Sequence, residues 1–167
     1  MQNRRLVLVR HAEAADAAVD ADRPLTASGA RRAAAIGDWL LEHAPAPERV
    51  LVSPARRTVQ TWARAGGAPP VLEPRIYEAT VEELLAVVRE TPDEVQQLAV
   101  VGHNPSISEL AAVLDDGQGD AAARRGFRFG FPTGGVAVFT LGTPFAATAP
   151  GAARLQAFAV PGADPVG

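Results

Sequence analysis

The residues of this chain that could do chemistry stand directly after short apolar runs. Each run, 6–9, 50–52 and 97–101, is predicted to be a buried strand. In an open parallel sheet, ligands bind beyond the carboxyl ends of the strands. If the three strands are neighbours, two arginines and two histidines meet in one crevice: Arg10, His11, Arg57 and His103.

Such a cationic crevice suits a phosphoryl group. The planar fork of an arginine makes paired hydrogen bonds to phosphate oxygens, and two arginines with an imidazole can stabilise the three equatorial oxygens of a transferring group. An imidazole has an unperturbed pKa of about 6.5 and is a nucleophile when neutral, and nearby cations keep it unprotonated. A helix starting at Pro54 would direct its positive end at the same anion. These features predict phosphoryl transfer with a histidine nucleophile.

Each of these residues also has an ordinary structural interpretation. A single histidine after a strand is more often a hydrogen-bonded structural residue, and a single arginine there is usually a surface charge. The combination at three strand ends favours function. The third histidine, His43, stands late in a predicted helix, where it favours the helix C-terminus and is expected to do no chemistry.

The elements that must position these residues alternate along the chain. The further predicted strands are 71–72, 135–141 and 153–160. The predicted helices are 27–43 after a Thr26 cap, 54–65 after a Ser53 cap, 81–90 after a Thr80 cap, and 106–114. Residues 115–130 are polar and rich in glycine, which predicts a loop. The alternation predicts an α/β fold, a three-layer α/β/α sandwich with a mostly parallel central sheet of about six strands.

Length and composition narrow the functional classes. A chain of 167 residues predicts one domain, 1–160, with a C-terminal tail at 161–167. The formal net charge of −3 gives no reason to expect nucleic acid or a membrane surface as partner. Cysteine is absent and all 16 cationic side chains are arginines, which excludes thiolate chemistry and a catalytic lysine. No apolar run matches a signal peptide or a membrane span, so we expect a cytoplasmic location.

Four blocks of sequence carry a family resemblance. They are Arg10-His11-Ala12, Asp22-Arg23-Pro24-Leu25-Thr26 followed by Gly29, Ser53-Pro54-Ala55-Arg56-Arg57-Thr58-Val59-Gln60-Thr61, and Val101-Gly102-His103-Asn104-Pro105. In this order they resemble the histidine phosphatase superfamily, which is related to the cofactor-dependent phosphoglycerate mutases. Within it the chain is most similar to the short SixA-type phosphohistidine phosphatases. The resemblance covers residues 6–114 and implies a phosphoglycerate mutase-like fold.

The resemblance implies roles for the matched residues. His11 would be the nucleophile that takes the phosphoryl group, and Arg10, Arg57 and His103 would bind that group and stabilise the transition state. Water would then hydrolyse phospho-His11, without a metal or another cofactor. Arg56 is one position off the pattern and is expected on the surface. Ala12 replaces the signature glycine, which is tolerable unless the backbone there needs a positive φ or very close approach to phosphate.

The proton donor is a separate question. Larger members of the family carry an acid on the loop after the third strand, where this chain has Glu78, and Glu13 is a weaker candidate. A buried carboxyl group can have a raised pKa and protonate an alkoxide leaving group. The alternative is that Glu78 is an exposed loop acid. An imidazole leaving group can depart already protonated, so a weak or absent acid favours phosphohistidine as substrate.

Three other functions stay open at this point. A phosphatase of small phosphomonoesters, such as sugar or nucleotide phosphates, would need a working acid at Glu78 and contacts from the loop 12–25. A non-catalytic phosphate-binding module would normally lose the nucleophile or an arginine. A metal-dependent phosphoesterase could use His11, Glu13, Asp16 and His103 as ligands, although the nearby arginines repel a divalent cation. The expected partner is thus a phosphorylated protein or a small phosphorylated metabolite, and the sequence leaves the oligomeric state open.

Overall fold

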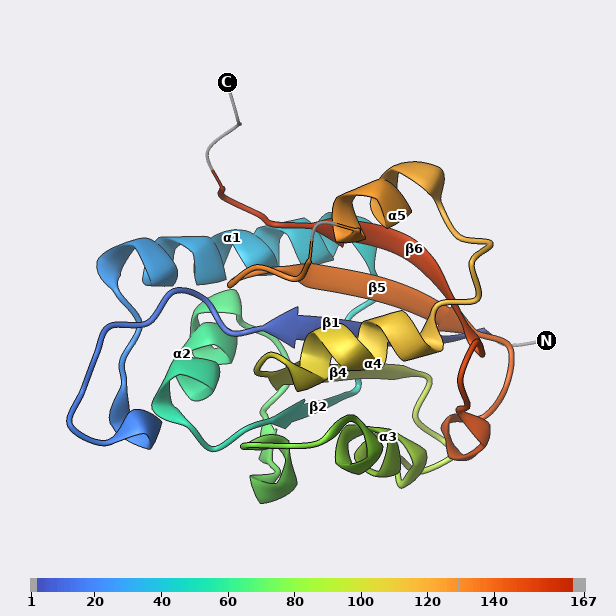
Figure 1. Ribbon diagram of the computed structural model, residues 1–167, viewed down its shortest axis with the longest axis horizontal. Helices are drawn as coiled ribbons and strands as arrows, with labels where there is room; N and C mark the ends of the chain where they lie inside the picture. The colour runs from blue at the N-terminus through green and yellow to red at the C-terminus, as the bar shows by residue number, and fades with distance from the viewer. Residues whose placement is uncertain (1–2, 129, 164–167) are drawn as a thin grey trace.

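Six strands form one mixed sheet in the computed structural model, which describes residues 3–128 and 130–163 (Figure 1). The strands are β1 (Arg4–Arg10), β2 (Arg49–Val52), β3 (Val71–Leu72), β4 (Gln97–Gly102), β5 (Val136–Leu141) and β6 (Ala153–Ala159). Their order is β3-β2-β4-β1-β5-β6. Strands β3, β2, β4 and β1 are parallel, whereas β5 is antiparallel to both β1 and β6. The predicted α/β fold with a mostly parallel sheet is confirmed.

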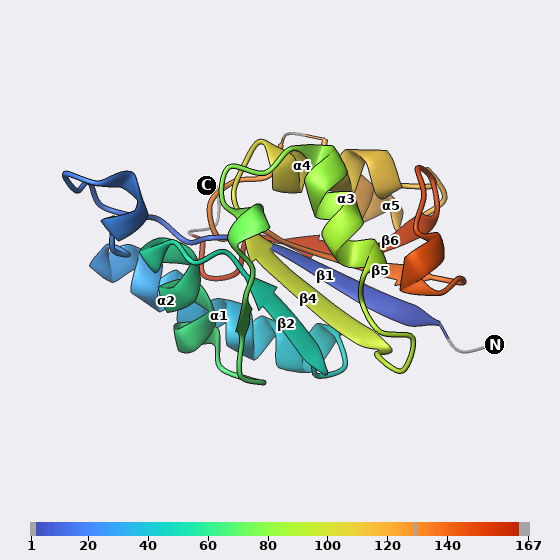
Figure 2. The ribbon, with the colours of Figure 1, turned by 90° about the horizontal axis from the view of Figure 1, so that it is seen from below.

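Helices cover both faces of this sheet. They are α1 (Ala27–His43), α2 (Arg56–Ala65), α3 (Val81–Arg89), α4 (Ser106–Leu114) and α5 (Ala121–Phe127). Short 3-10 turns are η1 (Asp20–Asp22), η2 (Pro74–Ile76) and η3 (Phe145–Ala147). Figure 2 shows α1 and α2 on one side of the sheet and α3, α4 and α5 on the other. The three-layer arrangement is therefore confirmed as well.

The alternation of side chains along β1 shows how the two layers of core arise. Leu6 and Leu8 pack into the core beneath α3 and α4, while Val7 and Val9 pack into the core beneath α1 and α2. Successive side chains of a strand point to opposite faces, so a strand covered on both sides must be apolar throughout. This requirement explains the unbroken apolar runs in the sequence.

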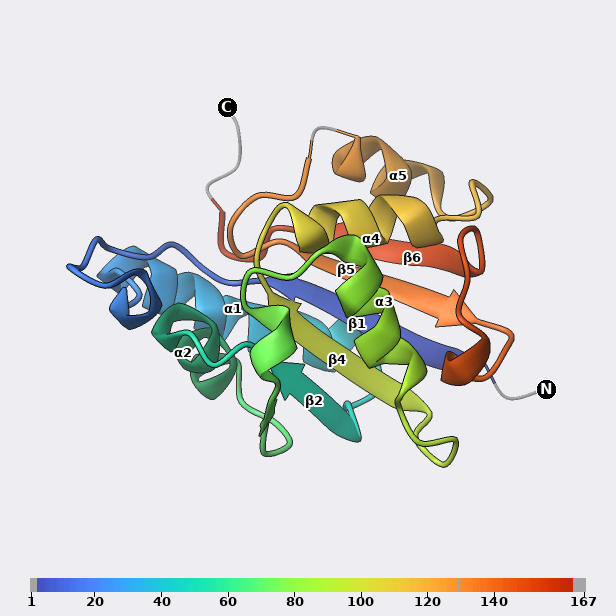
Figure 3. The same ribbon diagram turned by 60° about the horizontal axis from the view of Figure 1, so that its bottom comes forward.

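The register of the parallel strands brings three strand ends together. Strand β4 lies between β1 and β2, with Gly102 opposite Arg10 and Val101 opposite Val52. Figure 3 shows β2, β4 and β1 side by side and running in the same direction. The residues that follow these strands, His11 and His103 among them, consequently lie close together beyond the carboxyl ends of the strands.

Helix α1 has its predicted bounds, and the Thr26 side chain accepts a hydrogen bond from the Gly29 N–H. Helix α3 likewise begins after Thr80, which forms a capping box with Glu83. For α2, the prediction that Ser53 is the N-cap residue is wrong. Helix α2 begins at Arg56, and its N-cap residue is Ala55, which makes no side-chain cap bond.

The prediction of a loop over 115–130 is wrong in its second half. Helix α5 forms there because Asp120 caps it, accepting a hydrogen bond from the Ala123 N–H. Ala123 is buried, and the ring of Phe127 packs edge-on against Phe158 of β6. Tertiary packing thus stabilises a short helix that the local composition does not predict.

Two further observations concern the ends and the surface. The predicted tail 161–167 is described only as far as residue 163, and 164–167 lie outside the described residues. Over residues 3–128 and 130–163, no helix has both the length and the apolar character needed to cross a membrane.

Candidate active site

His11 lies at the end of β1 and is 8 % exposed. Its Nδ1 atom is 2.7 Å from the carbonyl oxygen of Ala12. A carbonyl oxygen only accepts hydrogen bonds, so Nδ1 carries the ring proton and Nε2 keeps a free lone pair. Burial, followed by the charges of Arg57 and Arg10, lowers the pKa of His11 to about 4. The ring is therefore neutral at physiological pH and can act as a nucleophile through Nε2.

Helix α2 fixes the backbone that follows this histidine. The Ala12 N–H donates to the hydroxyl oxygen of Thr61 at 3.0 Å, and this hydroxyl donates to the Arg57 carbonyl oxygen at 2.7 Å. Glu78 is the one non-glycine residue with positive φ in the described part of the chain, so Ala12 needs no glycine-like conformation. Sequence reasoning placed Thr61 in the motif but gave it no role, because the motif alone does not show its partners.

The second histidine lies against the first. The ring centroids of His103 and His11 are 5.3 Å apart, and His103 Nε2 is 2.7 Å from the hydroxyl oxygen of Ser53. That oxygen also lies 3.4 Å from the Ala55 N–H, which donates to it. The hydroxyl can then donate its hydrogen to Nε2, and in that arrangement the ring proton of His103 is on Nδ1. Burial, followed by the charge of Arg57, lowers the pKa of His103 to about 3, so this ring is neutral too.

The two arginines are anchored at their outer nitrogens. Arg10 donates from Nη1 to the Phe131 carbonyl oxygen at 3.0 Å, and Asn104 donates to the same oxygen at 2.8 Å. Arg57 is 6 % exposed and donates from Nη1 and Nη2 to the Asp20 carbonyl and carboxylate oxygens, at 2.8 and 3.1 Å. Burial lowers the pKa of Arg10 below its ordinary value.

Three buried nitrogens of this cluster have no hydrogen-bond partner among the described residues: Arg10 Nε, Arg57 Nε and His103 Nδ1. Buried polar groups in folded proteins are nearly always hydrogen-bonded, because an unpaired donor costs about 1–3 kcal/mol. Unpaired donors on three adjacent side chains around a neutral imidazole indicate a site built for an external acceptor. A phosphoryl group has three oxygens that could take these hydrogen bonds.

Loop residues close the outer side of the cluster. The Tyr77 hydroxyl donates to Asp20 Oδ2 at 2.6 Å, and Arg23 Nη1 lies 3.4 Å from Oδ1. The Tyr77 ring meets the His103 ring edge-on, with centroids 5.7 Å apart. The hydrogen bond from Tyr77, followed by Arg57, lowers the pKa of Asp20 to about 2, so its carboxylate is ionised. Sequence reasoning gave neither Asp20 nor Tyr77 a role.

The candidate proton donors lie elsewhere. Glu78 is exposed, with a φ of 57°, and its side chain makes no hydrogen bond to the described part of the chain. Glu78 is therefore an exposed loop acid, which is the alternative that the sequence left open. Glu13 is exposed and accepts a hydrogen bond from the Thr26 hydroxyl at 2.8 Å. Arg56 is exposed, as expected.

The residues that the sequence suggested as metal ligands do not lie together in one cluster. Asp16 is exposed and lies 4.0 Å from Arg23, and Glu13 faces Thr26. Within the part of the chain that the structure describes, no three His, Asp or Glu side chains are grouped so that they could hold a metal ion.

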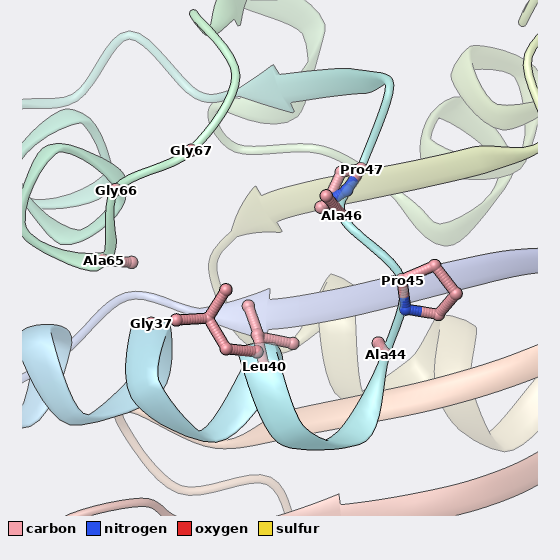
Figure 4. A pocket seen from close by; sticks show the side chains of 10 residues that line it. Gly37, Leu40, Ala44, Pro45, Ala46, Pro47, Ala65, Gly66 and Gly67 are labelled. Atoms are coloured by element: carbon pink, nitrogen blue, oxygen red, sulfur yellow. The ribbon is translucent and has the colours of Figure 1, made fainter.

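A separate hollow of about 240 Å³ lies at the carboxyl ends of α1 and α2 (Figure 4). Its lining includes Leu40, Pro45, Pro47 and Gly67, and none of its lining side chains is titratable. Arg57 stands near the opposite, amino end of α2. This hollow offers apolar surface but no group for acid, base or nucleophilic chemistry.

Known proteins resemble the chain over nearly its whole length. The model of the histidine phosphatase superfamily (branch 1) matches residues 6–107. An uncharacterised protein of Mycobacterium tuberculosis (strain H37Rv) is 40% identical over 157 residues, which are 92% of this chain and 99% of the relative. The phosphohistidine phosphatase SixA of Escherichia coli (strain K12) is 32% identical over 124 residues, 68% of this chain and 76% of the relative.

A solved structure from Nakamurella multipartitia, provisionally named phosphohistidine phosphatase SixA, superposes with a TM-score of 0.85. It is 37% identical in sequence, and the match covers 95% of this chain and 96% of that one.

Proposed function

The chain belongs to the histidine phosphatase superfamily, branch 1, and is a phosphatase with a histidine nucleophile; from this premise we propose that it hydrolyses phosphohistidine on proteins through a phospho-His11 intermediate. One observation carries the proposal. His11 is a buried neutral imidazole whose Nδ1 proton is committed to Ala12, and it stands beside three buried donors that lack partners.

The first step follows from this geometry. Nε2 of His11 attacks phosphorus, and the bond from phosphorus to the leaving nitrogen breaks with its electron pair going to that nitrogen. The donors of Arg10, Arg57 and His103 stabilise the negative charge on the three phosphoryl oxygens as it is transferred. Preorganised donors of this kind need no rearrangement at the moment of reaction, which is why they accelerate it.

The second step regenerates the enzyme. A water oxygen bonds to the phosphorus of phospho-His11, the electron pair of the broken P–N bond returns to Nε2, and both water protons leave with the phosphate as dihydrogen phosphate. The same three donors serve both transition states, because the phosphoryl oxygens occupy similar places in each. His11 returns to its neutral form, which its lowered pKa of about 4 favours at pH 7.

The leaving group supports phosphohistidine over an alkyl ester. An alkoxide must be protonated as it leaves, but Asp20 has a pKa of about 2 and Glu78 is exposed. An imidazole that carries a proton on its other nitrogen leaves as a neutral molecule without receiving one. The likeness to proteins named SixA phosphohistidine phosphatases supports the same substrate class.

The test measures phosphate release from a phosphohistidine peptide and from p-nitrophenyl phosphate, with EDTA present. We expect the wild type to hydrolyse both, and His11→Ala to lose activity by a factor on the order of 10⁴ or more. His43→Ala is the matched control, because His43 is exposed on α1 and stacks on Trp39. It should retain wild-type rates.

Two results would overturn the proposal. Full activity in His11→Ala would remove the assigned nucleophile. Hydrolysis of phosphomonoesters alone by the wild type would instead make the protein a metabolite phosphatase.

A further inference from the structure

Asp20 brings a negative charge into a site that is otherwise cationic. Its carboxylate is held by Arg57 at 3.1 Å and by the Tyr77 hydroxyl at 2.6 Å, and a third contact comes from Arg23 at 3.4 Å. These contacts join the loop that follows His11 to the loop that precedes α3. An anion beside a phosphate site opposes phosphate binding, so the Asp20 carboxylate is expected to have another function there.

The contacts of Arg57 with Asp20 leave one edge of its guanidinium for another acceptor. Asp20 binds the end of the guanidinium, through Nη1 and Nη2, while the buried Nε has no partner among the described residues. A guanidinium has five N–H donors, and its Nε edge can bind a second oxyanion while its Nη end is engaged. Arg57 can therefore hold a phosphoryl oxygen on its inner edge and Asp20 on its outer end at the same time.

Asp20 is the acid of this cluster that reaches solvent. In-line transfer places the leaving atom opposite the attacking Nε2 of His11, and a leaving group that belongs to another protein must extend into solvent. The side chains of His11, Arg57 and His103 are buried, whereas the Asp20 side chain is 52% exposed. Tyr77, which binds Asp20, also borders the His103 ring. The carboxylate thus lies at the solvent-facing border of the buried cluster.

We propose that Asp20 is a specificity-determining residue that selects a phosphorylated imidazole by accepting a hydrogen bond from the N–H of the leaving ring. The inference rests on the proposed function and deepens it. In protonated phosphohistidine one ring nitrogen carries the phosphoryl group and the other carries a proton. A carboxylate favours this protonated, positively charged ring.

The electron balance explains the selection. When the P–N bond breaks, its electron pair goes to the ring nitrogen, the proton stays on the other nitrogen, and neutral imidazole departs. A phosphomonoester instead develops negative charge on its leaving oxygen, which an ionised carboxylate repels and cannot protonate. The same side chain therefore assists one substrate class and opposes the other.

The experiment compares kcat/KM for a phosphohistidine peptide and for p-nitrophenyl phosphate in the wild type and in Asp20→Asn. The amide keeps the size of the side chain and an acceptor for Arg57 and Tyr77, but removes the charge. We expect phosphohistidine hydrolysis to fall by about 10- to 100-fold, as for loss of a charge-assisted hydrogen bond, and p-nitrophenyl phosphate hydrolysis to stay constant or rise. Asp22→Asn is the matched control, because Asp22 lies on the same 3-10 turn and is exposed.

Tyr77→Phe provides a second variant that leaves the Asp20 backbone unchanged. It keeps the carboxylate but removes one of its hydrogen bonds, so the ratio of the two kcat/KM values should shift in the same direction by about 2- to 5-fold. Circular dichroism checks that each variant is folded.

An unchanged ratio in Asp20→Asn would overturn the inference, and so would equal losses on both substrates, which would make Asp20 a clamp between loops. Failure of the proposed function has a different signature. In that case the wild type releases no phosphate from the phosphohistidine peptide, whatever Asp20→Asn does, and the inference falls with it.

Discussion

The floor and the rim of the site are built in different ways. The floor comprises Arg10, His11, Arg57 and His103. Arg10, His11 and His103 stand at or just beyond the ends of two adjacent parallel strands, and Arg57 stands in the first turn of α2. Three of the four residues are less than 9 % exposed. The rim comprises Asp20, on the short turn η1, and Tyr77, on the loop before α3, and a side-chain hydrogen bond joins them. In the function proposed above, the floor binds the group that is transferred, and the rim selects the molecule from which it is taken.

The difference also concerns stability. The floor holds unpaired donors in a buried place, which costs free energy that the surrounding sheet must supply. Hydrogen bonds and ion pairs of the rim are partly exposed, where solvent screens them, so each contributes little. Changes in the floor should therefore alter the rate for every substrate, while changes in the rim should alter the ratio between substrates.

The largest effect that would sharpen this distinction is expected at Arg57. Arg57→Ala removes the guanidinium that we propose binds a phosphoryl oxygen, so kcat/KM should fall by about 10³-fold for phosphohistidine and p-nitrophenyl phosphate alike. Arg56→Ala is the control, because Arg56 is the exposed neighbour on the same helix. Steady-state kinetics measures both variants. A loss restricted to one substrate would contradict this role and would show that Arg57, like the rim, acts on the choice between substrates.

An intermediate effect is expected at Ser53. Ser53→Ala removes the hydroxyl that contacts Nε2 of His103, and kcat should fall by about 10- to 100-fold on both substrates. The ¹⁵N chemical shifts of the His103 ring should show a mixture of tautomers in the variant and Nδ1–H alone in the wild type. Ser106→Ala is the control, since the Ser106 hydroxyl donates to the His103 carbonyl oxygen and not to its ring. An unchanged tautomer would refute the positioning role.

The smallest effect is expected at Glu78. Because Glu78 is exposed and phosphohistidine needs no proton donor, Glu78→Gln should change phosphohistidine hydrolysis by less than about 2-fold. Assays with an alkyl phosphate measure whether Glu78 protonates a poor leaving group, and Glu82→Gln, at the start of α3, controls for the lost charge. A large loss on phosphohistidine would place Glu78 within the reacting machinery.

The sequence was sufficient to predict the fold class and the grouping of the floor. Strand ends are set by local patterns, and parallel strands that share a sheet bring their ends to one edge. Arg10 and His103 could therefore be placed together although they lie far apart in the chain. Helix caps such as Thr26 are equally local, which is why α1 was predicted with its observed bounds.

The features that escaped prediction depend on contacts between distant segments. Ser53 followed by Pro54 has the pattern of a helix cap, and only the position of His103 shows where its hydroxyl is used. Asp20 begins the short turn η1, and the sequence around it does not indicate that Arg57 and Tyr77 are its partners. Helix α5 is stabilised by its packing on β6, and the polar sequence of residues 115–130 does not predict this contact.

The place of β4 in the sheet determines when the site can exist during folding. Strands β1 and β2 do not pair with each other; both pair with β4, which comes later in the chain than either. The pairing of Arg5 with Gln97 closes a long loop, a slow kind of contact because of its entropy cost. A nascent chain that ends before Gln97 thus has His11 and Arg57 but no strand to bring them together. Phosphate binding should appear in refolding only when β4 enters the sheet, so that the enzyme gains its ligand and its central strand in one event.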